Sequence, residues 1–81
     1  MNLNDTIKMM NSEDYKERFK AEYYQLDIRI KKLADVVMKY EQGQLEFKPD
    51  CSLELLQEQL YNMRRYRDCL EIRSNIENIE L

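Results

Sequence analysis

Seven apolar or aromatic residues recur in the first half of the chain at alternating intervals of four and three positions. They are Phe19, Tyr23, Leu26, Ile30, Leu33, Val37 and Tyr40. This spacing keeps one stripe on one side of an α-helix and is typical of a helix that packs along its length against another helix. We expect this helix to begin after Asn11 or Ser12, whose side chains can cap it, and to end near Gln42, because Gly43 suits the left-handed position after a helix.

A second apolar stripe fills the last third of the chain. It consists of Leu53, Leu56, Leu60, Met63, Tyr66, Leu70, Ile76 and Ile79. Asp50 or Ser52 can cap the helix that carries it. In the preceding segment the helical period is lost, and Pro49 favours an extended conformation at Lys48. The sequence therefore predicts a loop at residues 43–51 between two long helices.

The expected fold class is all-α, in one domain. It comprises a short N-terminal helix over 1–11, with Leu3, Ile7 and Met10 at helical spacing, a long helix over 12–42, the loop, and a second long helix over 52–79. Two helices of similar length joined by a short loop are expected to fold back on each other as an antiparallel helical hairpin.

The balance of apolar and charged residues favours self-association. Hydrophobic residues make up 43% of the 81 residues, and charged residues make up 36%. A chain this short buries little surface by itself. The first long helix also carries apolar and aromatic residues beside its stripe, among them Tyr15, Tyr24, Ile28, Val36 and Met38. We expect a second chain to cover this arc, which predicts a homo-oligomeric bundle.

Several functional classes are disfavoured by what the chain contains. The formal net charge is -3, so no overall field draws the protein to DNA, RNA or anionic lipid. There is no histidine, and Cys51 and Cys69 are too far apart for a zinc site. Without a base beside a nucleophile, or a glycine-rich phosphate loop, we expect neither an enzyme nor a cofactor. Nor does any stretch resemble a signal peptide or a membrane span, which predicts cytoplasmic residence.

Arginine and tyrosine are concentrated in the second long helix. The candidate ligand-binding residues are Tyr61, Arg64, Arg65, Tyr66, Arg67 and Arg73. Arginine can bind phosphate through two hydrogen bonds, and a tyrosine ring can stack on a base. Alternatively, these arginines pair with acidic residues of the other helix, such as Glu17, Glu22 and Asp27. Arg67 falls within the stripe itself, where it either fixes the register through a carboxylate or lies at an opening toward a ligand.

The chain resembles a family of small phage and prophage proteins first named from a reading frame of a crAss-like phage. The resemblance rests on the stretch from Asp14 to Leu26, on the segment from Gly43 to Cys51, and on the closing pattern of Leu56, Gln59, Met63, Tyr66, Leu70, Arg73 and Ile79-Glu80-Leu81. It implies a helical hairpin of phage or prophage origin, acting in the bacterial host cell.

A phage origin implies an accessory protein that counters host defence, and two mechanisms are open. The protein could bind and sequester an immune signal of the cyclic nucleotide or cyclic ADP-ribose type, as other small oligomeric hairpin proteins do. It could instead be an inhibitor or adaptor that presents a helix face to a host defence protein. A third hypothesis is a purely structural oligomer that scaffolds another phage protein.

Overall fold

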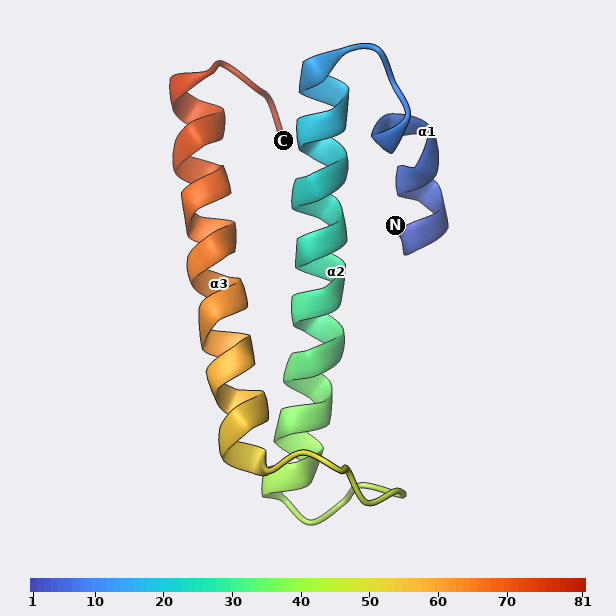
Figure 1. Ribbon diagram of the computed structural model, residues 1–81, viewed down its shortest axis with the longest axis vertical. Coiled ribbons are helices and arrows are strands. Elements are labelled where there is room, and N and C mark those ends of the chain that lie inside the picture. The colour runs from blue at the N-terminus through green and yellow to red at the C-terminus, as the bar shows by residue number, and fades with distance from the viewer.

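The computed structural model describes residues 1–81 and contains only helices. A 3-10 turn at Leu3–Thr6 leads into the short helix α1 (Ile7–Met10), followed by the long helices α2 (Tyr15–Glu41) and α3 (Leu53–Ile76). In Figure 1, α2 and α3 run antiparallel side by side, the connecting loop lies at one end, and α1 lies on the side of α2 away from α3. The all-α prediction is therefore confirmed. No helix combines the length and the apolar character that crossing a bilayer requires.

Helix α2 is closed at both ends by local hydrogen bonds. At its start the Asp14 carboxylate accepts from the Lys16 amide at 3.0 Å, so the cap is Asp14 and not the predicted Asn11 or Ser12. The Ser12 hydroxyl instead accepts from the Asp14 amide at 3.0 Å. At its end Gly43 adopts a φ of 68°, and the Gln44 amide donates to the Lys39 carbonyl at 2.8 Å. This pair of features defines a Schellman ending, in which a left-handed residue turns the chain back onto the last helical turn. The predicted role of Gly43 is confirmed.

Helix α3 begins at the predicted cap and ends three residues before the expected position 79. The Ser52 hydroxyl accepts from the Leu55 amide at 3.2 Å. Beyond Ile76 the chain turns at Asn78, whose φ is 57°, and the Ile79 amide donates to the Ser74 carbonyl at 2.8 Å. Asparagine tolerates the left-handed conformation better than other side chains that carry a Cβ, so it can end a helix as glycine does. Ile79 is thereby turned inward rather than continuing the helix.

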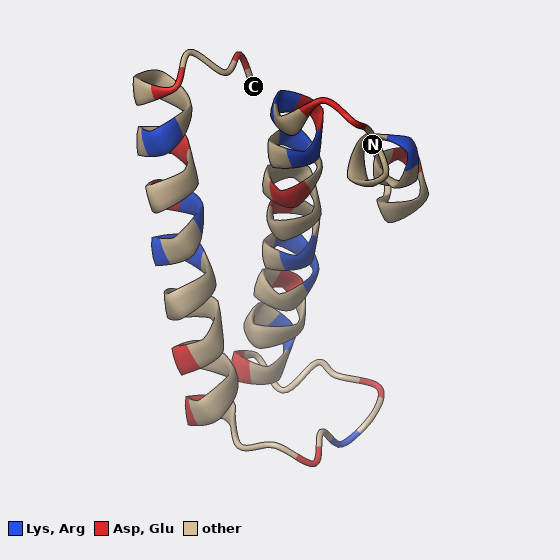
Figure 2. Ribbon diagram, turned by 45° about the horizontal axis from the view of Figure 1, so that its top comes forward, with Lys and Arg blue, Asp and Glu red and all other residues tan.

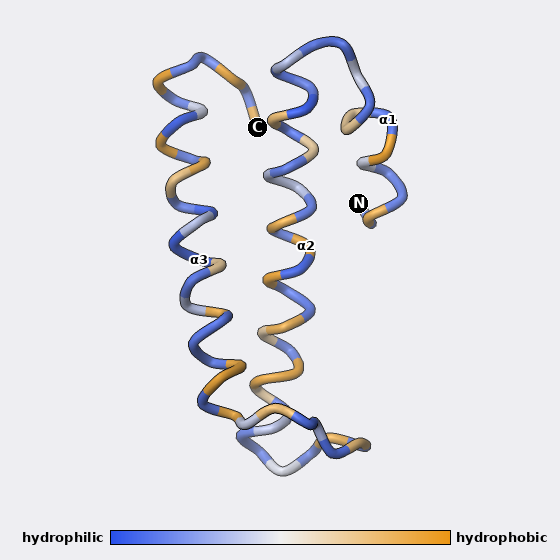
Figure 3. Tube along the Cα trace, viewed as in Figure 1, coloured by the Kyte–Doolittle hydropathy of each residue, from blue (hydrophilic) through white to orange (hydrophobic).

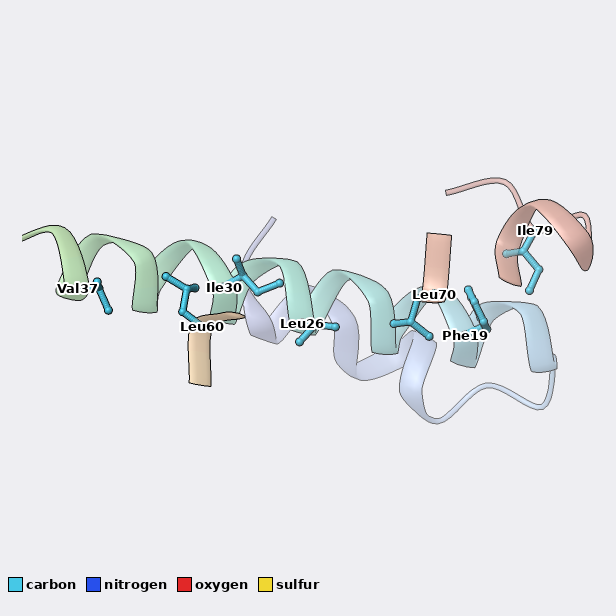
Figure 4. Close-up of a cluster of buried hydrophobic side chains, with 7 residues drawn as sticks. All are labelled: Phe19, Leu26, Ile30, Val37, Leu60, Leu70 and Ile79. Atoms are coloured by element: carbon cyan, nitrogen blue, oxygen red, sulfur yellow. The ribbon is translucent and has the colours of Figure 1, made fainter. Parts of the chain in front are cut away.

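The core is a single row of side chains between the two long helices. Its buried apolar members are Phe19, Leu26, Ile30, Val37, Leu60, Leu70 and Ile79. Figure 4 shows them strung along the length of α2, and Figure 3 shows hydrophobic positions recurring along that helix. Only 10 of the 81 residues are buried, so each core side chain contributes a large share of the hydrophobic stabilisation.

The N-terminal segment covers part of α2. Thr6 is fully buried, its hydroxyl donates to the Leu3 carbonyl at 2.7 Å, and it accepts from the Gln25 amide at 2.9 Å. Asn2 and Asp5 cap the segment reciprocally, each side chain accepting from the other residue's amide. The back of α2, which the sequence pattern led us to assign to a second chain, is thus partly occupied by the chain's own first residues.

The thin core makes one substitution especially informative. Leu70 is 1% exposed, and we expect Leu70→Ala to lower the free energy of unfolding by about 3 kcal/mol, because it removes apolar contact and leaves a cavity. Urea unfolding at fixed protein concentration, followed by circular dichroism, measures the change. Ile72→Ala is the control, since Ile72 is 60% exposed, and should change stability by less than about 0.5 kcal/mol. If both variants lose the same free energy of unfolding, the assignment of Leu70 to the core and of Ile72 to the surface is wrong.

Candidate functional site

A three-residue ion cluster lies on one edge of the contact between α2 and α3. The Arg67 guanidinium donates to the Asp27 carboxylate at 2.8 Å, and the Lys31 ammonium lies 2.9 Å from the second oxygen of that carboxylate. Lys31 first, and Arg67 with it, lower the pKa of Asp27 from its ordinary value by favouring the ionised form. Arg67 is therefore paired across the helices, as one of the two sequence interpretations expected.

A second polar contact lies on the same edge, one turn further along each helix. The Tyr23 hydroxyl donates to the Glu71 carboxylate at 2.8 Å. Partial burial, together with this hydrogen bond, raises the pKa of Tyr23 to about 12. Tyr23 therefore stays a neutral donor at physiological pH. The two contacts tie the polar edge of α3 to α2 at neighbouring levels.

Beside the ion cluster is a surface depression of about 290 Å³, which we call the Tyr24 depression. Its lining is Met1, Tyr24, Asp27, Ile28, Lys31 and Lys32. It places an aromatic ring beside two ammonium groups and within reach of the Asp27 end of the cluster. Lys31 and Lys32 were not among the sequence candidates, although the spacing of seven from Tyr24 brings Lys31 to the same face of α2.

Arg64 adds a further positive charge to this edge. Arg67 and Asp27 are in contact across the two antiparallel helices. Arg64 lies three residues before Arg67 on α3, and Lys31 lies four residues after Asp27 on α2. Arg64 is therefore level with Lys31. Its side chain is exposed and takes part in none of the ion pairs. We call Lys31, Arg64 and Arg67 the basic edge. Figure 2 shows Lys and Arg on both long helices along their middle turns.

The remaining sequence candidates lie elsewhere on α3. Arg65 points over the ring of Tyr61, with the guanidinium carbon 5.8 Å from the ring centre, and Tyr61 is 60% exposed on the outer side of the helix. Tyr66 is 45% exposed and lines a separate groove on α3. Consecutive helical residues point about 100° apart, so a run of neighbouring arginines and tyrosines is distributed around the helix rather than gathered on one face.

Arg73 belongs to a cluster at the end of the hairpin. Its guanidinium donates to the Glu77 carboxylate at 2.9 Å and to the Tyr15 hydroxyl at 2.7 Å, and it lies 5.0 Å from the centre of the Phe19 ring. Tyr15 in turn donates to Glu77 at 2.7 Å. These hydrogen bonds, led by the one from Tyr15, lower the pKa of Glu77. Through these contacts Arg73 links the C-terminal turn to the first turn of α2.

The candidates therefore separate into four locations. Arg64 and Arg67 lie on the basic edge, next to residues of α2 that sequence reasoning did not select. Tyr61 and Arg65 share the outer face, and Tyr66 lies on the opposite flank of α3. Arg73 pairs with Glu77 of its own turn rather than with Glu17 or Glu22 of α2, and Glu17 instead lies 3.5 Å from Lys20.

The ion cluster generates a pH prediction. The lowered pKa of Asp27 means that the stabilisation is present above the carboxyl's unfolded value near 3.8 and is lost as the pH falls through the lower folded-state value. We expect Asp27→Asn to reduce the free energy of unfolding by about 1 kcal/mol at pH 7, with the difference shrinking below the unfolded pKa. Asp35→Asn is the matched control, because the Asp35 and Lys39 pair is about half exposed. A deficit independent of pH would contradict the assignment.

Comparison with known proteins places the chain in a family. No curated protein and no solved structure matches it. The family model described as Sequestin matches residues 13–76, which include α2, the loop and α3. The name of this family indicates a sequestering protein, and because the match covers most of the chain, the protein belongs to the Sequestin family.

Proposed function

We propose that this protein binds and sequesters a nucleotide-type immune signal, such as a cyclic nucleotide or a cyclic ADP-ribose derivative, without catalysis. It acts in this proposal as a homo-oligomeric counter-defence protein of a phage or prophage, in the cytoplasm of the bacterial host. Membership of the Sequestin family supports sequestration as the activity. The class of ligand is inferred from the chemistry of the basic edge.

The observation that carries the ligand class is the position of the Tyr24 depression beside the basic edge. The ring of Tyr24 offers a surface on which a base can stack, while Lys31 and Lys32 line the same depression. Arg64 and Arg67 lie at the adjoining edge of α3, and guanidinium groups bind phosphate through paired hydrogen bonds. A nucleotide presents a base and a phosphate a few ångströms apart, which fits this arrangement.

The depression by itself does not enclose a ligand. It has a volume of about 290 Å³ and lies on the surface of α2, whereas sites for small molecules have volumes of about 300–1,000 Å³ and bury most of the ligand. Tight sequestration therefore requires a second surface over the depression. In the proposal this surface comes from another copy of the chain.

Charge reversal tests this proposal directly. Arg64→Glu and Lys32→Glu should each weaken nucleotide binding about tenfold or more, because each replaces an attraction to phosphate with a repulsion. Native mass spectrometry and calorimetry with cyclic dinucleotides, cyclic trinucleotides and ADP-ribose derivatives measure the binding. Neither residue takes part in an ion pair, so the fold should be unchanged by circular dichroism.

The matched controls are Arg29→Glu and Lys48→Glu. Both residues are exposed, unpaired and away from the depression, and each substitution changes the net charge by the same amount as its test variant. If the test and control variants weaken nucleotide binding equally, the effect is only long-range electrostatics. That result would overturn the proposed binding site at the Tyr24 depression. If no compound of the panel binds, the proposal of a nucleotide-type ligand is overturned. That result would favour the alternative, in which the protein binds a host protein through a helix face.

A further inference from the structure

An apolar groove runs along the flank of α3 that faces away from the basic edge. It has a volume of about 570 Å³, and we call it the α3 groove. Its lining is Leu55, Glu58, Gln59, Asn62, Met63 and Tyr66. Leu55 is 52% exposed and Tyr66 45% exposed, and Glu58 is the only charged residue among the six. An apolar centre with few charges is the composition of the buried part of a protein interface.

The chain exposes more surface than a compact protein of its mass. Its accessible area is 6040 Å², whereas a folded monomer of 10.0 kDa is expected to expose about 5,200 Å². The excess is roughly 800 Å², which is the area that one partner contributes to an interface of standard size. Its origin is the flat pairing of two helices, 43 × 25 × 16 Å, which leaves the flanks of α3 uncovered. One additional interface would remove this excess.

Two of the three pairs that the groove residues form in reverse order are complementary, and the third places Glu58 level with the partner's Met63. If a second α3 lies antiparallel across the groove, with the two-fold axis between Leu60 and Tyr61, Leu55 meets the partner's Tyr66 and Gln59 meets the partner's Asn62. The first pair is apolar, and the second joins two amides that can each donate and accept. Such reciprocity, in which residue i contacts j and j contacts i, is the requirement for a symmetric dimer.

The charges at the outer rim of the groove are complementary under the same symmetry. Glu58 and Arg65 lie seven residues apart, on neighbouring positions of the outer side of α3. The two-fold axis that pairs Leu55 with Tyr66 brings Glu58 within one turn of the partner's Arg65. Arg65 forms no ion pair within its own chain, and its guanidinium lies over the ring of Tyr61.

We propose that the α3 groove is the interface of a symmetric homodimer, in which two α3 helices pack antiparallel and Glu58 pairs with the partner's Arg65. The inference does not rest on the proposed ligand. Arg64 and Tyr66 are two residues apart and therefore point about 200° apart around the helix, so the dimer leaves the basic edge of each chain free. The resulting assembly carries two Tyr24 depressions on its outer flanks.

Sedimentation equilibrium of the full chain tests the interface. The wild-type protein should have twice the chain mass of 10.0 kDa, and Leu55→Glu and Tyr66→Glu should each raise the dimer dissociation constant at least tenfold, since each places a charge in an apolar contact. Both side chains are exposed in the single chain, so helicity should be retained. Ile72→Glu is the control, because Ile72 is exposed on α3 outside the groove and should leave the dimer intact.

A charge exchange tests the register independently. Glu58→Arg and Arg65→Glu should each weaken the dimer, because each places like charges opposite one another, and the double variant should regain most of the lost affinity. A monomeric wild-type protein would overturn the proposal and leave the groove to a different partner. An oligomer insensitive to Leu55→Glu and Tyr66→Glu would overturn it by placing the contact elsewhere. Nucleotide uptake is measured separately, and because this dimer leaves the basic edge free, failure of the interface does not overturn the proposed ligand.

Discussion

The packing of α2 against α3 through one row of apolar side chains is the contact on which the rest of the structure depends. Only seven buried apolar residues form it, six of them supplied by the two long helices and one, Ile79, by the turn after α3. A row one side chain deep cannot shield both faces of a helix, so the flanks of α2 and α3 remain at the surface. The same thinness that limits stability therefore provides the basic edge on one flank of α3 and the apolar α3 groove on the other.

Polar contacts along the edges fix how the two helices are aligned. A row of apolar side chains would tolerate a shift of one helix along the other by one helical repeat. Hydrogen bonds between specific side chains would be broken by such a shift. Glu41 accepts from Gln57 at 3.0 Å near the loop, Asp27 binds Arg67 in the middle, and Glu71 accepts from Tyr23 further on. Arg67 is the most informative of these residues. It replaces an apolar residue in the stripe of α3, and its carboxylate partner makes that position tolerable while marking a single register.

The elements of the fold were largely readable from the sequence because each has a local physical cause. The interval of four and three residues specifies a packed helix, and Gly43 and Ser52 specify where helices end and begin. The candidate site was less readable. Tyr61, Arg64, Arg65, Tyr66, Arg67 and Arg73 are close in sequence, but helical rotation spreads them over several faces. Lys31, which shares the Asp27 carboxylate with Arg67, belongs to a different part of the chain.

The sequence by itself determined the helices, the cap at Ser52, the ending at Gly43 and the side on which each helix is apolar, since all of these follow from interactions between residues a few positions apart. Only the tertiary structure decided which residues share a surface. It placed the first ten residues on the back of α2 through the buried Thr6, turned Ile79 into the core through the left-handed Asn78, and paired Arg67 with Asp27. Those outcomes depend on which faces meet after the chain reverses, and such distant contacts leave no periodic signal in a single sequence.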